Sequence, residues 1–150
     1  MAKIGFYHLM STPLDRALPR LLAQASARGF RIIVRAASAE RIEHLNALLW
    51  TYDDASFLAH GSARDGNPAS QPIYLTDRAE NPNAATMLVL VDGVEAEPDD
   101  LASYLRCCDM FDGNDDAAVE AARQRWRRAR DAGHTLTYWQ QTEKGWEQKA

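Results

Sequence analysis

The chain has 150 residues, of which 46% are hydrophobic and 25% are charged, and its formal net charge is -4. These values are typical of one globular domain and argue against disordered and fibrous proteins. An acidic chain is also a poor free-standing nucleic-acid binder, because affinity for phosphate comes from clustered Lys and Arg.

The first part of the chain alternates extended and helical patterns. A short aromatic-rich strand is expected at 4–9, and a helix with leucines at helical spacing follows it and ends at Gly29. The β-branched run at 30–34 predicts a second strand, after which Ser38 caps a second helix. We expect the inward face of that second helix to consist of Ile42, Leu45 and Leu49.

The stretch 51–71 differs from its surroundings in composition, being rich in Gly, Ser, Ala and Asp. It predicts a long surface loop with a brief extended piece at 56–58. Apolar runs at 72–75 and 87–91 then predict two further strands.

The last third predicts a short helix, a strand, a long helix and a final strand, at 98–104, 106–111, 114–132 and 134–140. Strands that alternate with helices indicate parallel βαβ units and a sheet covered on both faces. We therefore predict one α/β domain over 1–141 with a mainly parallel sheet. The polar segment 142–150 is expected to be a flexible tail.

The residues that cofactor chemistry requires are missing. The first strand-to-helix turn, residues 8–13, contains no glycine, so a phosphate-binding loop is not expected there. The histidines share no metal-ligand spacing, and no serine lies in a nucleophile-elbow pattern. We therefore expect no cofactor, no metal and no intrinsic catalysis.

The two cysteines, Cys107 and Cys108, are adjacent and are expected to be small buried side chains within a strand. The N-terminal ten residues lack the pattern of a signal peptide, and no segment approaches the roughly 20 apolar residues of a membrane span. These observations predict a cytoplasmic protein without membrane contact.

The long helix has an uneven charge distribution. It begins with acidic residues and ends with five arginines, at 123, 125, 127, 128 and 130. Arg123, Trp126 and Arg127 share one side of the helix, and Arg130 extends that side by a turn, whereas Arg125 lies off it. Two interpretations are equally open at this point: a solvated face that complements the helix dipole, or a site for an acidic peptide, with nucleic acid as the competing ligand.

A second feature is the aromatic pair Trp50 and Phe57, which lies where the second helix ends and the long loop begins. One interpretation is that both side chains are core residues that hold the loop down. The other is an exposed apolar patch, which usually marks a protein interface.

Taken in order along nearly the whole chain, several short motifs resemble the chi subunit family of bacterial DNA polymerase III. These are Phe6-Tyr7-His8-Leu9, Glu40-Arg41, Leu48-Leu49-Trp50-Thr51, Ser56-Phe57-Leu58-Ala59-His60, Pro72-Ile73, Phe111-Asp112-Gly113, Ala121 with Arg123, Trp126, Gly133, and Leu136-Tyr138-Trp139.

The resemblance implies a non-catalytic α/β protein of the clamp loader, with a nucleotide-binding-like topology and two partners. The acidic C-terminal tail of single-stranded DNA-binding protein, which ends in Pro-Phe, would bind at Arg123, Trp126 and Arg127. The psi subunit would bind at Trp50 and Phe57. The net charge of -4 and the presence of only one basic helix predict no tight direct binding of nucleic acid. The alternative from another class is an α/β enzyme or small-molecule-binding domain.

Overall fold

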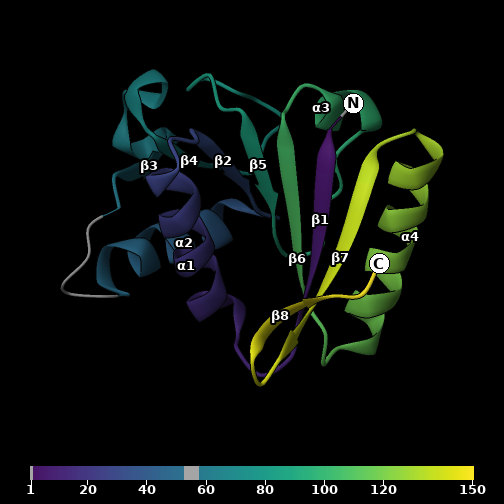
Figure 1. Cartoon of the computed structure of the whole chain (residues 1–150). Coiled ribbons are helices and arrows are strands. Elements are labelled where there is room, and N and C mark those ends of the chain that lie inside the picture. Colours follow the sequence, from purple (N-terminus) through teal and green to yellow (C-terminus); the bar gives the residue numbers. More distant parts are fainter. Residues whose placement is uncertain (1, 53–57) are drawn as a thin grey trace.

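The computed structural model describes residues 2–52 and 58–150, which form one eight-stranded sheet with helices on both faces (Figure 1). The strands are β1 (Lys3–Leu9), β2 (Ile32–Arg35), β3 (His60–Ser62), β4 (Ile73–Thr76), β5 (Met87–Leu90), β6 (Arg106–Asp112), β7 (Thr135–Thr142) and β8 (Gly145–Gln148). The helices are α1 (Leu14–Ala27), α2 (Ala39–Thr51), α3 (Pro98–Ala102) and α4 (Asp116–Asp131), with two short 3₁₀ turns at Ala63–Asp65 and Pro68–Ser70.

The strand order is β3-β4-β2-β5-β6-β1-β7-β8, and each neighbouring pair is parallel except β7 with β8. Parallel strands need crossover connections, and here α1, α2, α3 and α4 supply four of them. The predicted α/β class, with a mainly parallel sheet, is confirmed.

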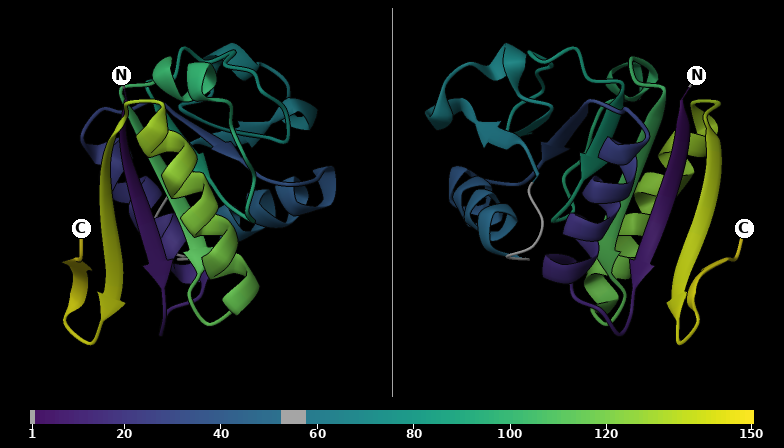
Figure 2. Two further views of the ribbon diagram at one scale, coloured as in Figure 1. Left: turned by 90° about the vertical axis from the view of Figure 1, so that its right-hand side faces the viewer. Right: turned by 60° about the vertical axis from the view of Figure 1, so that its left-hand side comes forward.

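Two apolar layers hold the helices against the sheet. Because successive side chains of β2 point to opposite faces of the sheet, Val34 lies in the layer under α1 and α2. Ile33 lies in the layer that includes residues of α3 and α4. The predicted inward face of α2 is confirmed, because Ile42, Leu45 and Leu49 are all buried in the first layer. Figure 2 shows the two helical layers on opposite sides of the sheet.

The helix starts follow from local side-chain chemistry. The Ser38 hydroxyl accepts a hydrogen bond from the Arg41 amide at 3.2 Å, as expected of a cap. One Asp115 carboxylate oxygen accepts from the amides of Ala117 and Ala118, at 2.9 and 3.3 Å. The Ser38 cap lies where the sequence predicts it.

The stretch 51–71 contains more structure than expected. His60–Ser62 forms β3, which pairs with β4 at one edge of the sheet. Its sequence, His-Gly-Ser, has no strand propensity, so the pairing with β4 decides its conformation. Apart from Leu58, the extended piece expected at 56–58 lies outside the described residues.

The C-terminal segment forms a strand where the sequence predicts a flexible tail. β8 pairs antiparallel with β7 and forms the other edge of the sheet. The Trp146 ring lies edge-on to the Tyr7 ring, with centroids 5.3 Å apart. This long-range contact and the hydrogen-bonded hairpin order a segment whose four strand residues are all exposed.

Both cysteines are buried and free, as the sequence predicts. Burial raises the pKa of Cys107 and of Cys108 to about 12, so both are neutral thiols at physiological pH. In the part of the chain that the structure describes, no helix combines the length and apolar character that crossing a membrane requires.

Candidate binding surfaces

The inward side of α4 is fixed to the sheet by a buried ion pair. Arg125, only 7% exposed, donates from Nε and Nη2 to the two carboxylate oxygens of Asp109 on β6, at 2.6 and 3.0 Å. Burial raises the pKa of Asp109, and the hydrogen bonds and charge of Arg125 oppose that rise. Arg125 is therefore a structural residue that orients α4, and it belongs to no solvent-facing charge cluster.

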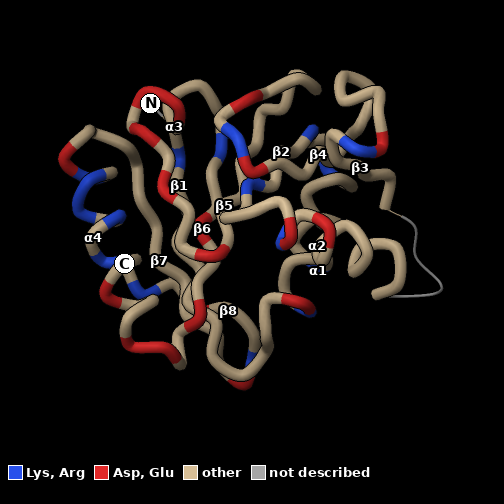
Figure 3. Tube along the Cα trace, turned by 180° about the vertical axis from the view of Figure 1, so that it is seen from behind, with Lys and Arg blue, Asp and Glu red and all other residues tan. Residues whose placement is uncertain are grey.

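The outer flank of α4 brings the predicted site residues together. At 3.6 residues per turn, Arg123, Trp126, Arg127 and Arg130 fall within a sector of about 100°. The three arginines are exposed, and the tryptophan is half-buried. Figure 3 shows the basic residues along the second part of α4 and the acidic residues at its start.

The arginines of this flank differ in how they are partnered. Arg123 lies 3.7 Å from Glu120, and Arg130 lies 3.3 Å from Asp131, in both cases within the same helix. Arg127 forms no ion pair with any residue that the structure describes. Its guanidinium is therefore available to a carboxylate from another molecule.

An apolar strip lies beside these arginines, between α4 and β7. The Trp126 ring packs edge-on against Phe6 and Tyr138, with centroid separations of 5.3 and 5.9 Å. The Tyr138 hydroxyl is hydrogen-bonded to Nδ1 of His8 at 2.5 Å. Burial raises the pKa of Tyr138, and the positive charge of Arg123 opposes this rise.

Sequence reasoning did not assign Tyr138 to this surface. The signal was available in the last strand, where Leu136 and Tyr138 alternate with polar residues and face α4, in the same layer as Trp126 and Val119. Only the pairing of β7 with β1 shows that this face meets α4.

The turn after β6, which lies close to β1, requires a glycine at position 113. A Cβ atom at this position would overlap the His8 ring and the carbonyl oxygen of Leu9. The Gly113 amide donates to that carbonyl at 2.7 Å, so the turn after β6 approaches β1 closely. The glycine of the Phe111-Asp112-Gly113 motif is therefore required because no side chain fits at that position.

The other predicted surface lies at the end of α2. Trp50 is 54% exposed, and its ring contacts the ring of His60 with centroids 4.5 Å apart. His60 is buried, and its ring nitrogens contact the carbonyl oxygens of Leu58 and Asn46 at 2.5 and 3.1 Å. Trp50 is thus a surface residue, and the interpretation of it as a core residue is wrong. Phe57 lies outside the described residues.

The two surfaces are well separated. α2 covers one face of the sheet, and α4 covers the other, toward the opposite edge (Figures 1 and 2). A partner bound at Trp50 therefore leaves the outer flank of α4 accessible to a second partner.

A cleft of about 780 Å³ lies at the carboxyl ends of the central strands, where doubly wound folds bind nucleotides. The turn after β1 directs three successive amides, those of Met10, Ser11 and Thr12, toward one point. The Gln141 side-chain oxygen accepts from all three, at 3.1, 3.1 and 2.9 Å. A side chain of the protein itself thus satisfies the amides that would otherwise face an anion.

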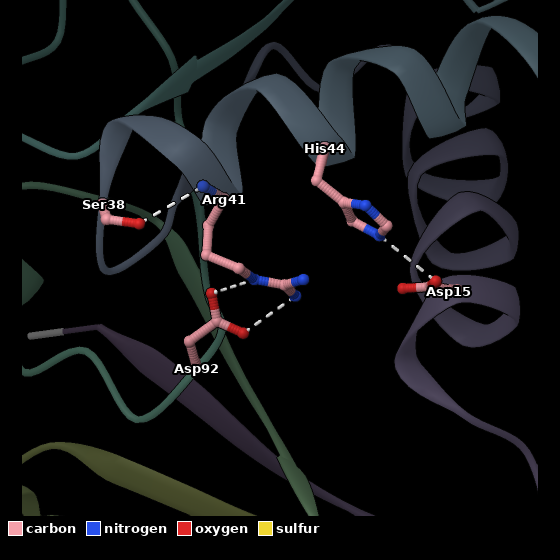
Figure 4. Close-up of polar contacts among 5 residues, drawn as sticks. All are labelled: Asp15, Ser38, Arg41, His44 and Asp92. Carbon is pink, nitrogen blue, oxygen red and sulfur yellow. Dashed lines mark hydrogen bonds and ion pairs between the residues drawn. The ribbon is translucent and has the colours of Figure 1, made fainter.

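The charges of this cleft are also paired internally. Arg41 donates from Nε and Nη2 to Asp92 at 2.9 and 3.0 Å (Figure 4). Beside it, His44 on α2 lies 3.3 Å from Asp15 on α1. Arg125, the other basic residue of the lining, is held by Asp109. Both guanidinium groups already contact carboxylates, which makes this cleft a poor phosphate site.

The described residues contain no group of three or more His, Cys, Asp or Glu side chains arranged to hold a metal ion.

The fold and its surfaces define a doubly wound α/β domain in which the phosphate position is occupied by Gln141. Two separate helices carry a tryptophan at the surface, Trp50 of α2 being exposed and Trp126 of α4 half-buried.

A family model described as "DNA polymerase III chi subunit, HolC" matches residues 1–137, and the chain belongs to this family. It is also 35% identical, over 106 residues, to the "Probable DNA polymerase III subunit chi" of Rickettsia prowazekii (strain Madrid E). That match covers 71% of this chain and 61% of the relative. The resemblance read from the sequence is confirmed, and the match spans about three fifths of the length of this relative.

Proposed function

We propose that this chain is a non-catalytic adaptor of the clamp loader, acting in the cytoplasm. The outer flank of α4, formed by Arg123, Trp126, Arg127 and Arg130, binds the acidic C-terminal tail of single-stranded DNA-binding protein. The surface around Trp50, together with Phe57, binds the psi subunit. The chain thereby links the protein that coats single-stranded DNA to the machine that loads the clamp.

The observation that carries the tail-binding assignment is the arrangement of cations around a half-buried aromatic strip. A peptide that is acidic and ends in Pro-Phe presents carboxylates and an apolar ring in one short segment. Arg127 has no carboxylate partner among the described residues, and Trp126 with Tyr138 offers an apolar contact beside it. Guanidinium groups grip carboxylates in a two-pronged geometry, which favours the acidic end of such a peptide.

The assignment of the psi surface is supported by the exposure of Trp50. A tryptophan that is 54% exposed at a helix end is unusual for an isolated domain and is typical of an interface anchor. α2, which carries Trp50, lies on the face of the sheet opposite α4 (Figure 2), and this suits an adaptor that contacts two proteins at once.

The test is a calorimetric titration of the full chain with a tail peptide ending in Pro-Phe. Arg123→Ala and Arg127→Ala should each weaken binding by about 2 kcal/mol, because each leaves a peptide carboxylate partly desolvated and unpaired. Wild-type binding should be roughly micromolar and should weaken with salt.

Arg128→Ala is the matched control. Arg128 lies on the opposite flank of the same helix and contacts Glu95 at 3.0 Å. Arg125 is unsuitable, because its loss would leave Asp109 buried and unpaired. Equal losses from Arg127→Ala and Arg128→Ala would show a diffuse electrostatic attraction and would contradict a defined site on the outer flank.

A further inference from the structure

A third surface lies on the part of the sheet that no helix covers. α1 packs beside β6, and on the same side of the sheet β1 and β7 remain open, bordered by the β7–β8 hairpin (Figures 1 and 2). Two hollows of about 390 and 150 Å³ lie there and share Tyr7 and Trp139 in their walls. We call the two hollows together the hairpin groove.

Aromatic rings form the floor and one wall of the hairpin groove. Tyr7 and Trp139 are register partners on adjacent strands, and their ring planes differ by 9° with centroids 6.4 Å apart. The Tyr7 ring lies over Gly5, where a Cβ would come within 2.9 Å of the tyrosine Cε2 atom. Trp146 stands edge-on to Tyr7 at 5.3 Å. Two parallel rings thus lie beside an upright one.

The charged residues of the hairpin groove are all basic. Arg20 lines the larger hollow, and Lys3 and Arg106 line the smaller one, whereas no carboxylate lines either. Arg28 also lies close enough to oppose, together with Arg106, the rise that burial causes in the pKa of Tyr7. None of these four side chains forms an ion pair with a residue in the described ranges.

The hairpin has two acidic residues, Glu143 in its turn and Glu147 on β8, and neither lines either hollow. Glu147 is the register partner of Gln140, whereas Trp146 is the partner of Gln141, which lines the hairpin groove. Successive residues of a strand point to opposite faces, so the Glu147 carboxylate is directed away from the aromatic rings. This surface is therefore locally positive on a chain whose net charge is -4.

We propose that the hairpin groove is a weak binding site for single-stranded nucleic acid. Flat aromatic side chains stack on bases of any sequence, and cations along the same groove neutralise the backbone phosphates. A duplex would not use the rings, because its bases are already stacked on one another. An acidic peptide ending in Pro-Phe would satisfy the cations but offers a single ring to three aromatic side chains. The overall acidity of the chain limits affinity, which agrees with the expectation of no tight nucleic-acid binding.

The test is a fluorescence-anisotropy titration of the full chain with a labelled oligothymidylate of about 12 nucleotides, a length that spans one single-strand site. Binding should appear at low salt and weaken with a log–log slope of about -2, as expected for roughly three phosphate contacts. Trp146→Ala should weaken binding about fivefold through lost stacking. Arg20→Ala should weaken binding and reduce the slope by about 0.7.

Matched controls separate this site from the two surfaces described above. Trp50→Ala removes another exposed tryptophan and Arg123→Ala another exposed arginine, and both should bind the oligonucleotide like wild type. Absence of binding at low salt, or equal losses in the controls, would overturn the proposal. Arg20 and Trp146 are both exposed, so either variant can test the groove if the other fails to fold.

A parallel titration with the tail peptide keeps this proposal distinct from the adaptor function. Trp146→Ala and Arg20→Ala should leave tail-peptide affinity unchanged. If they weaken the peptide and not the oligonucleotide, the hairpin groove is a peptide site and the nucleic-acid proposal fails. Failure of tail binding in the wild-type chain would leave the oligonucleotide result unaffected.

Discussion

The helices α2 and α4 are held by ion pairs of the same geometry in different surroundings. In α2, Arg41 contacts Asp92 through Nε and Nη2 at 2.9 and 3.0 Å. In α4, Arg125 contacts Asp109 through the same atoms at 2.6 and 3.0 Å. The side chains of the first pair are 35% and 19% exposed, whereas those of the second are 7% and 4% exposed.

This difference shows that burial, more than hydrogen-bond geometry, decides what an ion pair does for the protein. Water can solvate Arg41 if Asp92 is lost, so the α2 pair is a modest contact. Asp109 has no such alternative, and its charge depends on Arg125. The α4 pair therefore fixes the helix rotation that turns Arg123 and Arg127 outward.

The largest effect is expected for Arg125→Ala, which tests whether the buried ion pair of α4 is more important for stability than the exposed pair of α2. It leaves the Asp109 carboxylate buried and unpaired, and we expect a loss of about 3–5 kcal/mol in the free energy of unfolding. Urea unfolding followed by circular dichroism measures this loss. The double variant Arg125→Met with Asp109→Leu removes both charges and should recover most of the stability. A loss below 1 kcal/mol for Arg125→Ala would contradict the structural role.

A second comparison concerns the two tryptophans. Trp126→Ala should lower the free energy of unfolding by about 2 kcal/mol, because a half-buried ring loses its contacts with Phe6 and Tyr138. Trp50→Ala should cost less than about 1 kcal/mol, because more than half of that side chain is already exposed. Thermal unfolding of both variants shows which one is less stable. A larger loss of stability for Trp50→Ala than for Trp126→Ala would mean that Trp50 is the more buried of the two tryptophans.

The smallest effect is expected for Arg41→Ala. Its pair with Asp92 is partly exposed, so the loss should be about 1 kcal/mol or less and should shrink as salt is raised. Urea unfolding at two salt concentrations measures both features. A loss as large as that of Arg125→Ala would mean that burial does not distinguish the two pairs.

Much of the fold was predictable because it depends on neighbours along the chain. The apolar runs that form β2, β5 and β6, and the caps Ser38 and Asp115, act within a few residues of their own positions. The candidate site on α4 was predictable in part, because helical spacing alone places Arg123 and Arg127 on one side. Which side of α4 faces the sheet was visible only as a weak apolar pattern, and the arginine cluster obscured it.

The sequence by itself determined the alternation of strands and helices, the buried central strands and the family. The tertiary structure decided that Arg125 turns inward, that His60–Ser62 and Gly145–Gln148 are strands, and that Gln141 satisfies the amides after β1. Each of these depends on a partner distant in the chain, such as Gln141 and Ser11, which are 130 residues apart. Local propensity cannot report such contacts, because their free energy exists only once the sheet has brought the partners together.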